Sequence, residues 1–151
     1  MNIAIFVSGR GSNLEAILKA KKQGFLTSDF IVISNNKQAK AIDIAKDYNT
    51  EVFYFDQKPK RLFEENVLRL LKEKNVDFIV LAGFMAILSG DFIKAYPQKI
   101  INIHPSLLPA FKGINVHKRV IESGVKYTGA TVHFVTEDID AGCIIAQTIS
   151  P

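Results

Sequence analysis

The chain alternates short apolar runs with segments whose apolar residues recur at helical spacing. Unbroken apolar runs of four to seven residues predict strands buried on both faces, and spacings of three and four predict amphipathic helices. The predicted strands are 3–7, 30–34, 52–55, 78–81, 100–103, 130–135 and 144–149. The predicted helices are 14–22, 41–48, 62–74, 92–96 and 117–123.

This alternation predicts right-handed crossovers between parallel strands, with helices on both faces of the sheet. No convincing helix separates 130–135 from 144–149, so these two segments predict an antiparallel or mixed edge. We therefore expect one α/β domain over residues 1–151, built on a doubly wound, mostly parallel sheet. Ligands of such sheets bind outside the carboxyl ends of the strands, which is where candidate chemistry is sought.

Composition excludes several classes of protein. The 151 residues are 48% hydrophobic and 23% charged, which rules out a disordered, collagenous or coiled-coil chain. No apolar run reaches the roughly 18 residues of a membrane span, and the first residues lack the basic segment of a signal peptide. A single cysteine, Cys143, fits a reducing compartment and is expected to be a small buried side chain. We expect a cytoplasmic protein.

The net charge of +4 is compatible with an anionic partner. The lysines are nevertheless scattered from Lys19 to Lys126, and no basic cluster is interleaved with aromatic residues. We therefore expect no nucleic-acid and no membrane partner, and small-molecule substrates instead. The three histidines and Cys143 show no short ligand spacing, so no metal site is expected.

A glycine-rich turn, Ser8–Asn13, follows the first predicted strand and leads into a helix. Free backbone N–H groups at a helix start favour a phosphate or a carboxylate. The turn lacks the third glycine of a dinucleotide fingerprint, because Leu14 stands there, and it lacks the lysine of a Walker loop. An anion cradle remains. The alternative is a plain turn in which Ser12 or Asn13 caps the helix.

The segment 82–88 after the fourth predicted strand is apolar where a surface loop is usually polar. An apolar loop beside a site forms a wall for a flat ligand. The alternative is that this segment belongs to the buried core.

The fifth predicted strand places Asn102 and His104 two residues apart, so that their side chains share one face. A carboxamide and an imidazole side by side suit the stabilisation of charge on a carbonyl oxygen. The alternative is a buried structural histidine. Thr131 and His133 share a face in the same way, on a strand that ends in the acidic segment 136–140. An aspartate from that segment near His104 would favour the imidazolium and fix its tautomer.

Together these motifs resemble the folate-dependent phosphoribosylglycinamide formyltransferases of purine synthesis. The resemblance covers essentially the whole chain and is most specific over 102–113, supported by 9–13, 81–85 and 129–134 with Asp140 and Gly142. It implies a formyltransferase-like fold and an enzyme that transfers formyl from N10 of 10-formyltetrahydrofolate, its co-substrate, to the amine of phosphoribosylglycinamide. We expect a monomer or a homodimer.

The resemblance also implies residue roles. The amides of Gly11, Ser12 and Asn13 would hold the ribonucleotide phosphate. Asn102 and a protonated His104 would stabilise the oxyanion, Asp140 would support the imidazolium, and no covalent intermediate would form. Thr131 and His133 would support this group. The folate would contact a larger set: Lys60, Met85, Ala86, Ile87, Leu88, Asn102, Thr136, Glu137, Asp138, Ile139 and Asp140. The carboxylates of Glu137 and Asp138 are expected to be solvated.

Three features depart from the family pattern. Ala86 stands where many relatives have arginine, and Lys60 occupies a place often held by arginine near the acidic tail of the folate. A lysine there keeps the charge without the bidentate fork. Relatives also continue for several tens of residues past the position of Pro151, through a further strand region and a long helix. We expect either a fragment of a longer enzyme or a chain of impaired stability and activity.

Two alternative functions stay open. A formyltetrahydrofolate hydrolase shares parts of the pattern, although hydrolases usually carry a second histidine where Pro105 stands. A truncated, non-catalytic relative would keep phosphate or folate binding and would not turn over.

Overall fold

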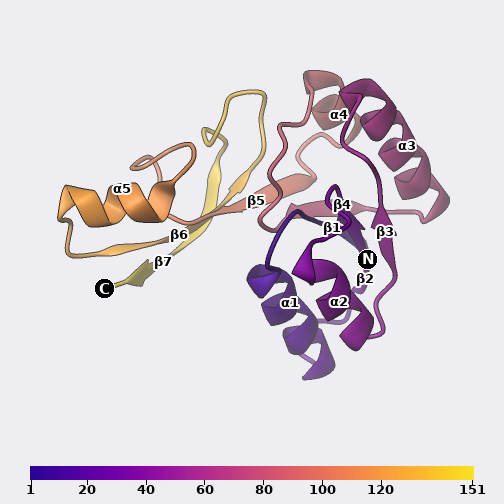
Figure 1. Cartoon of the computed structure of the whole chain (residues 1–151), viewed down its shortest axis with the longest axis horizontal. Helices are drawn as coiled ribbons and strands as arrows, with labels where there is room; N and C mark the ends of the chain where they lie inside the picture. The colour runs from indigo at the N-terminus through magenta and orange to yellow at the C-terminus, as the bar shows by residue number, and fades with distance from the viewer. The chain divides into compact units, whose positions relative to one another are not determined.

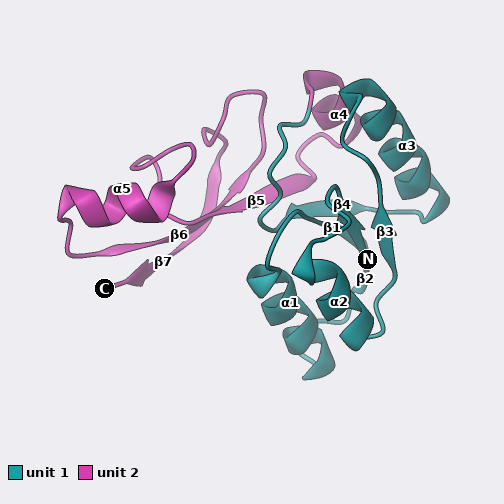
Figure 2. Cartoon of the chain, viewed as in Figure 1, with its two compact units in different colours: residues 1–88 teal, residues 89–151 magenta.

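The computed structural model describes residues 1–151 as two compact units, 1–88 and 89–151 (Figure 2). The first unit contains, in chain order, β1 (Asn2–Val7), α1 (Ser12–Lys22), β2 (Asp29–Ser34), α2 (Lys40–Asp47), β3 (Val52–Tyr54), α3 (Lys60–Glu73) and β4 (Phe78–Leu81). The second contains α4 (Gly90–Ala95), β5 (Ile100–His104), α5 (Val116–Ser123), β6 (Thr128–Phe134) and β7 (Ile144–Ser150). Every predicted element is present, with bounds that differ by two residues at most.

The strands of the first unit form a parallel sheet in the order β3-β2-β1-β4. Ile5 at the middle of β1 faces Val32 of β2 on one side and Val80 of β4 on the other. Helices α1 and α2 pack together on one face of this sheet, and α3 lies on the other (Figure 1). The four residues from Ala4 to Val7 are therefore completely buried, as the unbroken apolar run predicted.

Helix α3 shows how the sequence pattern becomes packing. Its buried apolar residues, Phe63, Val67, Leu70 and Leu71, follow one another at helical spacing and form a single stripe. The helix ends at Lys74, and Asn75 follows in the left-handed region with φ 51°, a conformation that asparagine tolerates at helix ends. No helix of the chain is long and apolar enough to cross a membrane.

The strands of the second unit pair antiparallel. β6 lies between β5 and β7, and its register places His133 opposite Asn102 and Thr131 opposite His104. Together with the parallel strands of the first unit, this pairing confirms the predicted α/β fold: a doubly wound, mostly parallel arrangement with an antiparallel edge.

The prediction that Cys143 is buried is wrong, because its side chain is exposed. Cys143 directly precedes β7, and all seven residues of β7 are exposed as well. β7 pairs with β6 along one side only. An apolar run identifies a strand, but it does not show whether other elements cover that strand.

Candidate active site

The start of α1 lies at the carboxyl end of β1, where the sequence predicted an anion cradle. Gly11 is the N-cap residue and lies in the left-handed region with φ 79°. No side chain caps the helix, so the alternative in which Ser12 or Asn13 acts as a cap is wrong. Both residues are exposed in the first turn, and their backbone N–H groups have no acceptor in the chain. These groups are available to an anion, with the helix dipole in support.

Gly11 is required at this position for two separate reasons. Its positive φ disfavours any residue with a Cβ, and a Cβ there would lie 2.8 Å from both Cα and Cβ of Ala41 in α2. We expect Gly11→Ala to lower the free energy of unfolding by about 1–2 kcal/mol for the backbone conformation, and by about 1–3 kcal/mol more for the overlap with Ala41. Chemical denaturation measures both contributions together.

Gly24→Ala is the matched control for that substitution. Gly24 has φ 83°, and a Cβ there would meet nothing within 4 Å. This variant therefore reports the backbone cost alone. Equal losses in the two variants would contradict the close approach of α1 and α2 at Gly11.

The loop 82–88 contains both a half-buried aromatic anchor, Phe84, and an exposed apolar pair, Met85 and Ile87. The ring of Phe84 lies edge-on to Phe6 at 5.3 Å and stacks on Phe63 at 6.2 Å between centroids. Met85 and Ile87 project outward and are 74% and 63% exposed. The core interpretation therefore applies to part of this segment, and the wall interpretation applies to Met85 and Ile87. These two side chains provide an apolar surface for a flat ligand.

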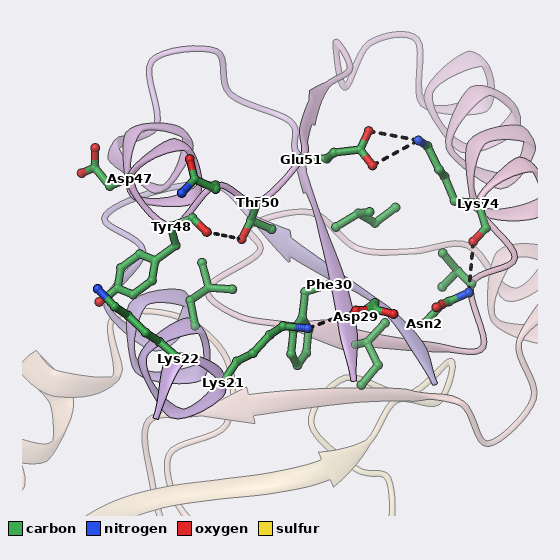
Figure 3. Close-up of a pocket in the computed structure, with 15 residues that line it drawn as sticks. Asn2, Lys21, Lys22, Asp29, Phe30, Asp47, Tyr48, Thr50, Glu51 and Lys74 are labelled. Carbon is green, nitrogen blue, oxygen red and sulfur yellow. Dashed lines mark hydrogen bonds and ion pairs between the residues drawn. The ribbon is translucent and has the colours of Figure 1, made fainter. Parts of the chain in front are cut away.

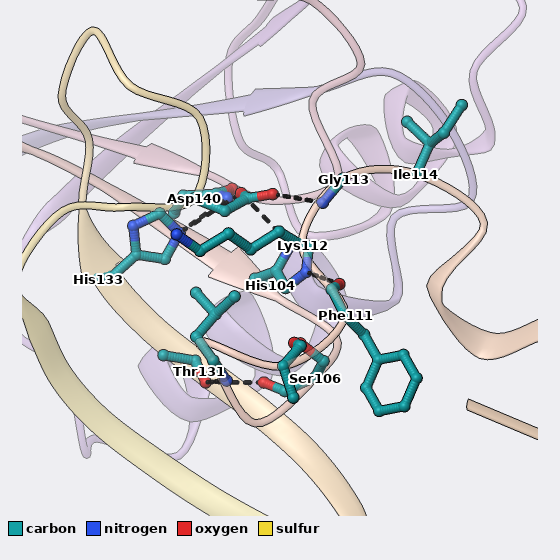
Figure 4. A network of polar contacts seen from close by, with 12 residues as sticks. His104, Ser106, Phe111, Lys112, Gly113, Ile114, Thr131, His133 and Asp140 are labelled. Atoms are coloured by element: carbon teal, nitrogen blue, oxygen red, sulfur yellow. Dashed lines mark hydrogen bonds and ion pairs between the residues drawn. The ribbon is translucent and has the colours of Figure 1, made fainter. Parts of the chain in front are cut away.

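Two histidines of the second unit lie near the carboxylate of Asp140 (Figure 4), and Asn102 lies beside one of them. His104 Nδ1 lies 3.4 Å from Asp140 Oδ1, and His133 Nε2 lies 3.9 Å from the same oxygen. Asn102 Nδ2 lies 3.3 Å from His133 Nε2. Both histidines are buried, and the side chain of Asp140 is 10% exposed. The structure thus brings together the Asn102, His104 and Asp140 predicted from the sequence.

The hydrogen bonds of His133 orient Asn102. His133 Nδ1 lies 2.9 Å from the carbonyl oxygen of Phe134, which only accepts. A neutral ring that donates from Nδ1 accepts at Nε2, and Asn102 donates one N–H to such a ring. The second N–H of the Asn102 carboxamide is left for a ligand.

Both ring nitrogens of His104 face acceptors. Nε2 lies 2.9 Å from the carbonyl oxygen of Phe111, and Nδ1 faces the carboxylate of Asp140. Only a ring with hydrogens on both nitrogens donates to both partners. Each ring nitrogen of His104 therefore has an acceptor within the second unit, and an Nε2–H is the donor that an oxyanion would take over.

Asp140 joins two loops of the second unit. Its Oδ2 accepts the backbone N–H of Gly113 at 2.8 Å, and its backbone lies in the left-handed region with φ 53°. Gly142 follows closely, and a Cβ there would lie 1.6 Å from the carbonyl oxygen of Phe134. Glycine at 142 therefore allows the acidic loop to return against β6. The contacts from Phe111 and Gly113 were missed from the sequence, because they come from backbone atoms that no side-chain pattern marks.

Thr131 holds the segment that follows His104. Its Oγ1 donates to the carbonyl oxygen of Ser106 at 2.7 Å and accepts the backbone N–H of Leu108 at 3.0 Å. Gln147 of β7, which sequence reasoning missed, donates to both Thr131 Oγ1 and Leu108 O at 3.0 Å. Thr131 is fully buried, so its support is structural and indirect.

The remaining predicted folate contacts lie on exposed segments. Ile139 is 57% exposed, and Glu137 makes only a long ion pair of 3.9 Å with Lys94 at the surface. Glu137 and Asp138 are exposed, as expected. Lys60 is exposed at the first residue of α3, whereas Leu88 is buried.

In the first unit, a cavity of about 700 Å³ lies at the edge of the sheet where the strands begin, which is the edge opposite Ser8–Asn13 (Figure 3). Its main charges neutralise each other, because Lys21 pairs with Asp29 at 3.1 Å and Lys74 with Glu51 at 3.0 Å. Ligands of open α/β sheets bind at the carboxyl edge instead. No group of three or more side chains in the chain has an arrangement that could hold a metal ion.

A family model described as formyl transferase matches residues 1–151. The chain belongs to the formyl transferase family. It is 42% identical to the phosphoribosylglycinamide formyltransferase of Bacillus subtilis over 148 residues, which are 95% of this chain and 76% of that protein. It is 44% identical to the trifunctional purine biosynthetic protein adenosine-3 of Gallus gallus, covering all of this chain and 16% of that protein.

Solved structures of family members share the fold. Phosphoribosylglycinamide formyltransferase from Anaplasma phagocytophilum superposes with a TM-score of 0.92 at 43% identity, over all of this chain and 72% of that one. Glycinamide ribonucleotide transformylase 1 from Symbiobacterium toebii superposes with a TM-score of 0.95 at 36% identity, and the match covers 100% of this chain and 73% of that one. The family resemblance and the formyltransferase-like fold predicted from the sequence are confirmed. The chain spans 16% of the Gallus gallus trifunctional relative, 76% of the Bacillus subtilis protein, 72% of the Anaplasma phagocytophilum protein and about half of the chloroplastic relatives.

Proposed function

We propose that this formyl transferase moves a formyl group from 10-formyltetrahydrofolate to the amine of phosphoribosylglycinamide in purine biosynthesis. The observation that carries the proposal is the group formed by Asn102, His104 and Asp140. The Asp140 carboxylate lies 3.4 Å from the buried His104 imidazole, and Asn102 joins the group through His133. The names of the relatives support the amine substrate, and the family supports the formyl chemistry.

The residues of the second unit suit a direct transfer. The amine attacks the formyl carbon, the new C–N bond forms, and the carbonyl π electrons move to oxygen. Asn102 Nδ2–H and His104 Nε2–H then donate to the oxyanion, while Asp140 keeps the ring oriented through Nδ1. As the oxyanion collapses, the bond from carbon to N10 breaks, N10 takes a proton, and the attacking nitrogen releases one.

This mechanism requires one exchange of partners. His104 Nε2 donates to the carbonyl oxygen of Phe111 in the structure. The formyl oxygen must replace that carbonyl as the acceptor when the substrate binds. The segment around Phe111 is tied to the site through Gly113 and Asp140, so its movement is coupled to the catalytic carboxylate.

Binding roles follow from exposure and charge. The free N–H groups of Gly11, Ser12 and Asn13 would hold the ribonucleotide phosphate. The pterin would contact the exposed Met85 and Ile87, together with their neighbours Ala86 and Leu88. Lys60 would contact the acidic tail of the folate, and the loop 136–140 would supply further folate contacts.

Several organisational features belong to the same proposal. We propose one formyltransferase-like domain over 1–151, because the family match runs through the whole chain. Action in the cytoplasm, a monomeric or homodimeric state, and the lack of nucleic-acid and membrane partners stay predictions. They depend on the scattered charge and the composition described above.

Steady-state assays with both substrates test the function. We expect formylated amine to accumulate as 10-formyltetrahydrofolate is consumed, at rates that depend on both concentrations. Release of formate with the amine omitted would identify a hydrolase instead. Binding of the ribonucleotide without turnover would identify a non-catalytic binding module.

A further inference from the structure

A chain of hydrogen bonds joins the carboxyl ends of the four strands in the first unit. It follows the strand order β3-β2-β1-β4, because Gln57 follows β3, Asn35 follows β2, Ser8 follows β1 and Met85 follows β4. Asn35 Nδ2 donates to Gln57 Oε1 at 3.0 Å. Ser8 Oγ donates to Asn35 Oδ1 at 2.6 Å and accepts the backbone N–H of Met85 at 2.8 Å. Ser8 and Asn35 are each 8% exposed.

The donor of each hydrogen bond in this series follows from the bond at the Met85 end. The backbone N–H of Met85 only donates, so Ser8 accepts from it and gives its own hydrogen to Asn35. The carboxamide oxygen of Asn35 therefore faces Ser8, and its NH₂ group faces Gln57. Each member has one orientation that satisfies its neighbours, so the four residues act as a unit.

The hydrogen-bond chain ends in the loop 82–88, where the half-buried Phe84 is followed by the exposed Met85. Phe84 is held by the rings of Phe6 and Phe63, and the next residue, Met85, is 74% exposed. The Ser8 hydroxyl binds the backbone at this transition. Beside it lies a cavity of about 510 Å³ that Ser8, Asn35, Gln57 and Met85 help to line.

We propose that Ser8 and Asn35 are positioning residues for the folate site. They hold the backbone of Met85, and thereby set where Met85 and Ile87 present their apolar side chains to the pterin. The inference rests on the function proposed above and adds two residues that the resemblance did not assign. The phosphate cradle keeps a separate support, because Asn36 Nδ2 donates to the backbone carbonyl of Ser8 at 3.1 Å.

Ser8→Ala tests this role, because it leaves the Met85 N–H and the Asn35 oxygen unpaired. Losing a buried partner costs about 1–3 kcal/mol, so we expect hydrogen exchange at the Met85 amide to be about tenfold faster or more. We expect the Kd for 10-formyltetrahydrofolate to rise by about the same factor. The affinity for the ribonucleotide and kcat should change much less than the folate Kd. Ser8→Thr, which keeps the hydroxyl, should restore folate affinity.

Ser34→Ala is the matched control. The Ser34 hydroxyl is also buried at this edge, but it bonds only the backbone of Asn36, at 2.8 and 3.1 Å. Its loss should lower stability and leave the folate Kd unchanged. Unchanged folate affinity in Ser8→Ala, or an equal change in Ser34→Ala, would overturn the positioning role. Equilibrium titration with 10-formyltetrahydrofolate does not require turnover. An inactive wild-type protein would contradict the proposed function, but the folate Kd values of the variants would still test the positioning role of Ser8 and Asn35.

Discussion

Replacing His104 with alanine is expected to lower kcat at least about a hundredfold, because one oxyanion donor contributes roughly 3–4 kcal/mol to transition-state stabilisation. His104 is the group whose Nδ1 faces Asp140, at 3.4 Å, and whose Nε2 is available to the formyl oxygen once Phe111 moves away. Asn102→Ala should produce a loss of the same order, since it removes the neighbouring donor. Steady-state formyl transfer at saturating substrates measures both variants.

His117→Ala is the control for the histidine substitution. His117 is exposed on α5 and has no part in the group around Asp140. Its kcat should equal that of the wild-type protein. Near-normal turnover in His104→Ala would contradict the assignment of the site.

Asp140→Asn is expected to lower kcat at least about a hundredfold as well, the scale typical of acid–base groups. Asparagine retains an oxygen for the Gly113 N–H and tolerates the positive φ of residue 140. The NH₂ group that replaces the other oxygen cannot accept from His104 Nδ1. The loop should therefore stay in place while the imidazole loses its partner.

Two measurements separate the loss of the imidazole's partner from damage to the loop in Asp140→Asn. Thermal unfolding should change little, and the Kd of each substrate should rise much less than kcat falls. Asp43→Asn, which replaces an exposed carboxylate of α2, should leave kcat unchanged. A large loss of folate affinity with normal kcat would place Asp140 in binding instead of chemistry.

Much of the fold follows from hydrophobic pattern alone. The run from Ile3 to Val7 predicts a fully buried strand, and the structure has one, because α1 and α2 on one face and α3 on the other cover β1. The side chains of Cys143 and β7 show the limit of this reasoning. Their apolar character predicts a strand, whereas exposure depends on which elements pack against it.

The site residues could be predicted from the sequence where their side-chain type and spacing indicate their chemistry. A spacing of two on β5 predicted that Asn102 and His104 act together, and the register with β6 adds His133 beside them. The acceptor at Phe111 and the donor at Gly113 are backbone atoms, so no residue type indicates them. Ser8 and Asn35 were also missed as a pair, because their bond joins residues 27 apart in the chain.

Mass spectrometry of a quenched single turnover tests the central claim most directly. The donor carries ¹⁸O in its formyl group, and the protein is in excess over 10-formyltetrahydrofolate with the amine substrate present. Direct attack of the amine predicts that the formylated product retains the ¹⁸O label and that the protein mass stays unchanged at every time point. Labelled formate in place of product, or a protein species that carries the formyl group, would contradict direct transfer in this site.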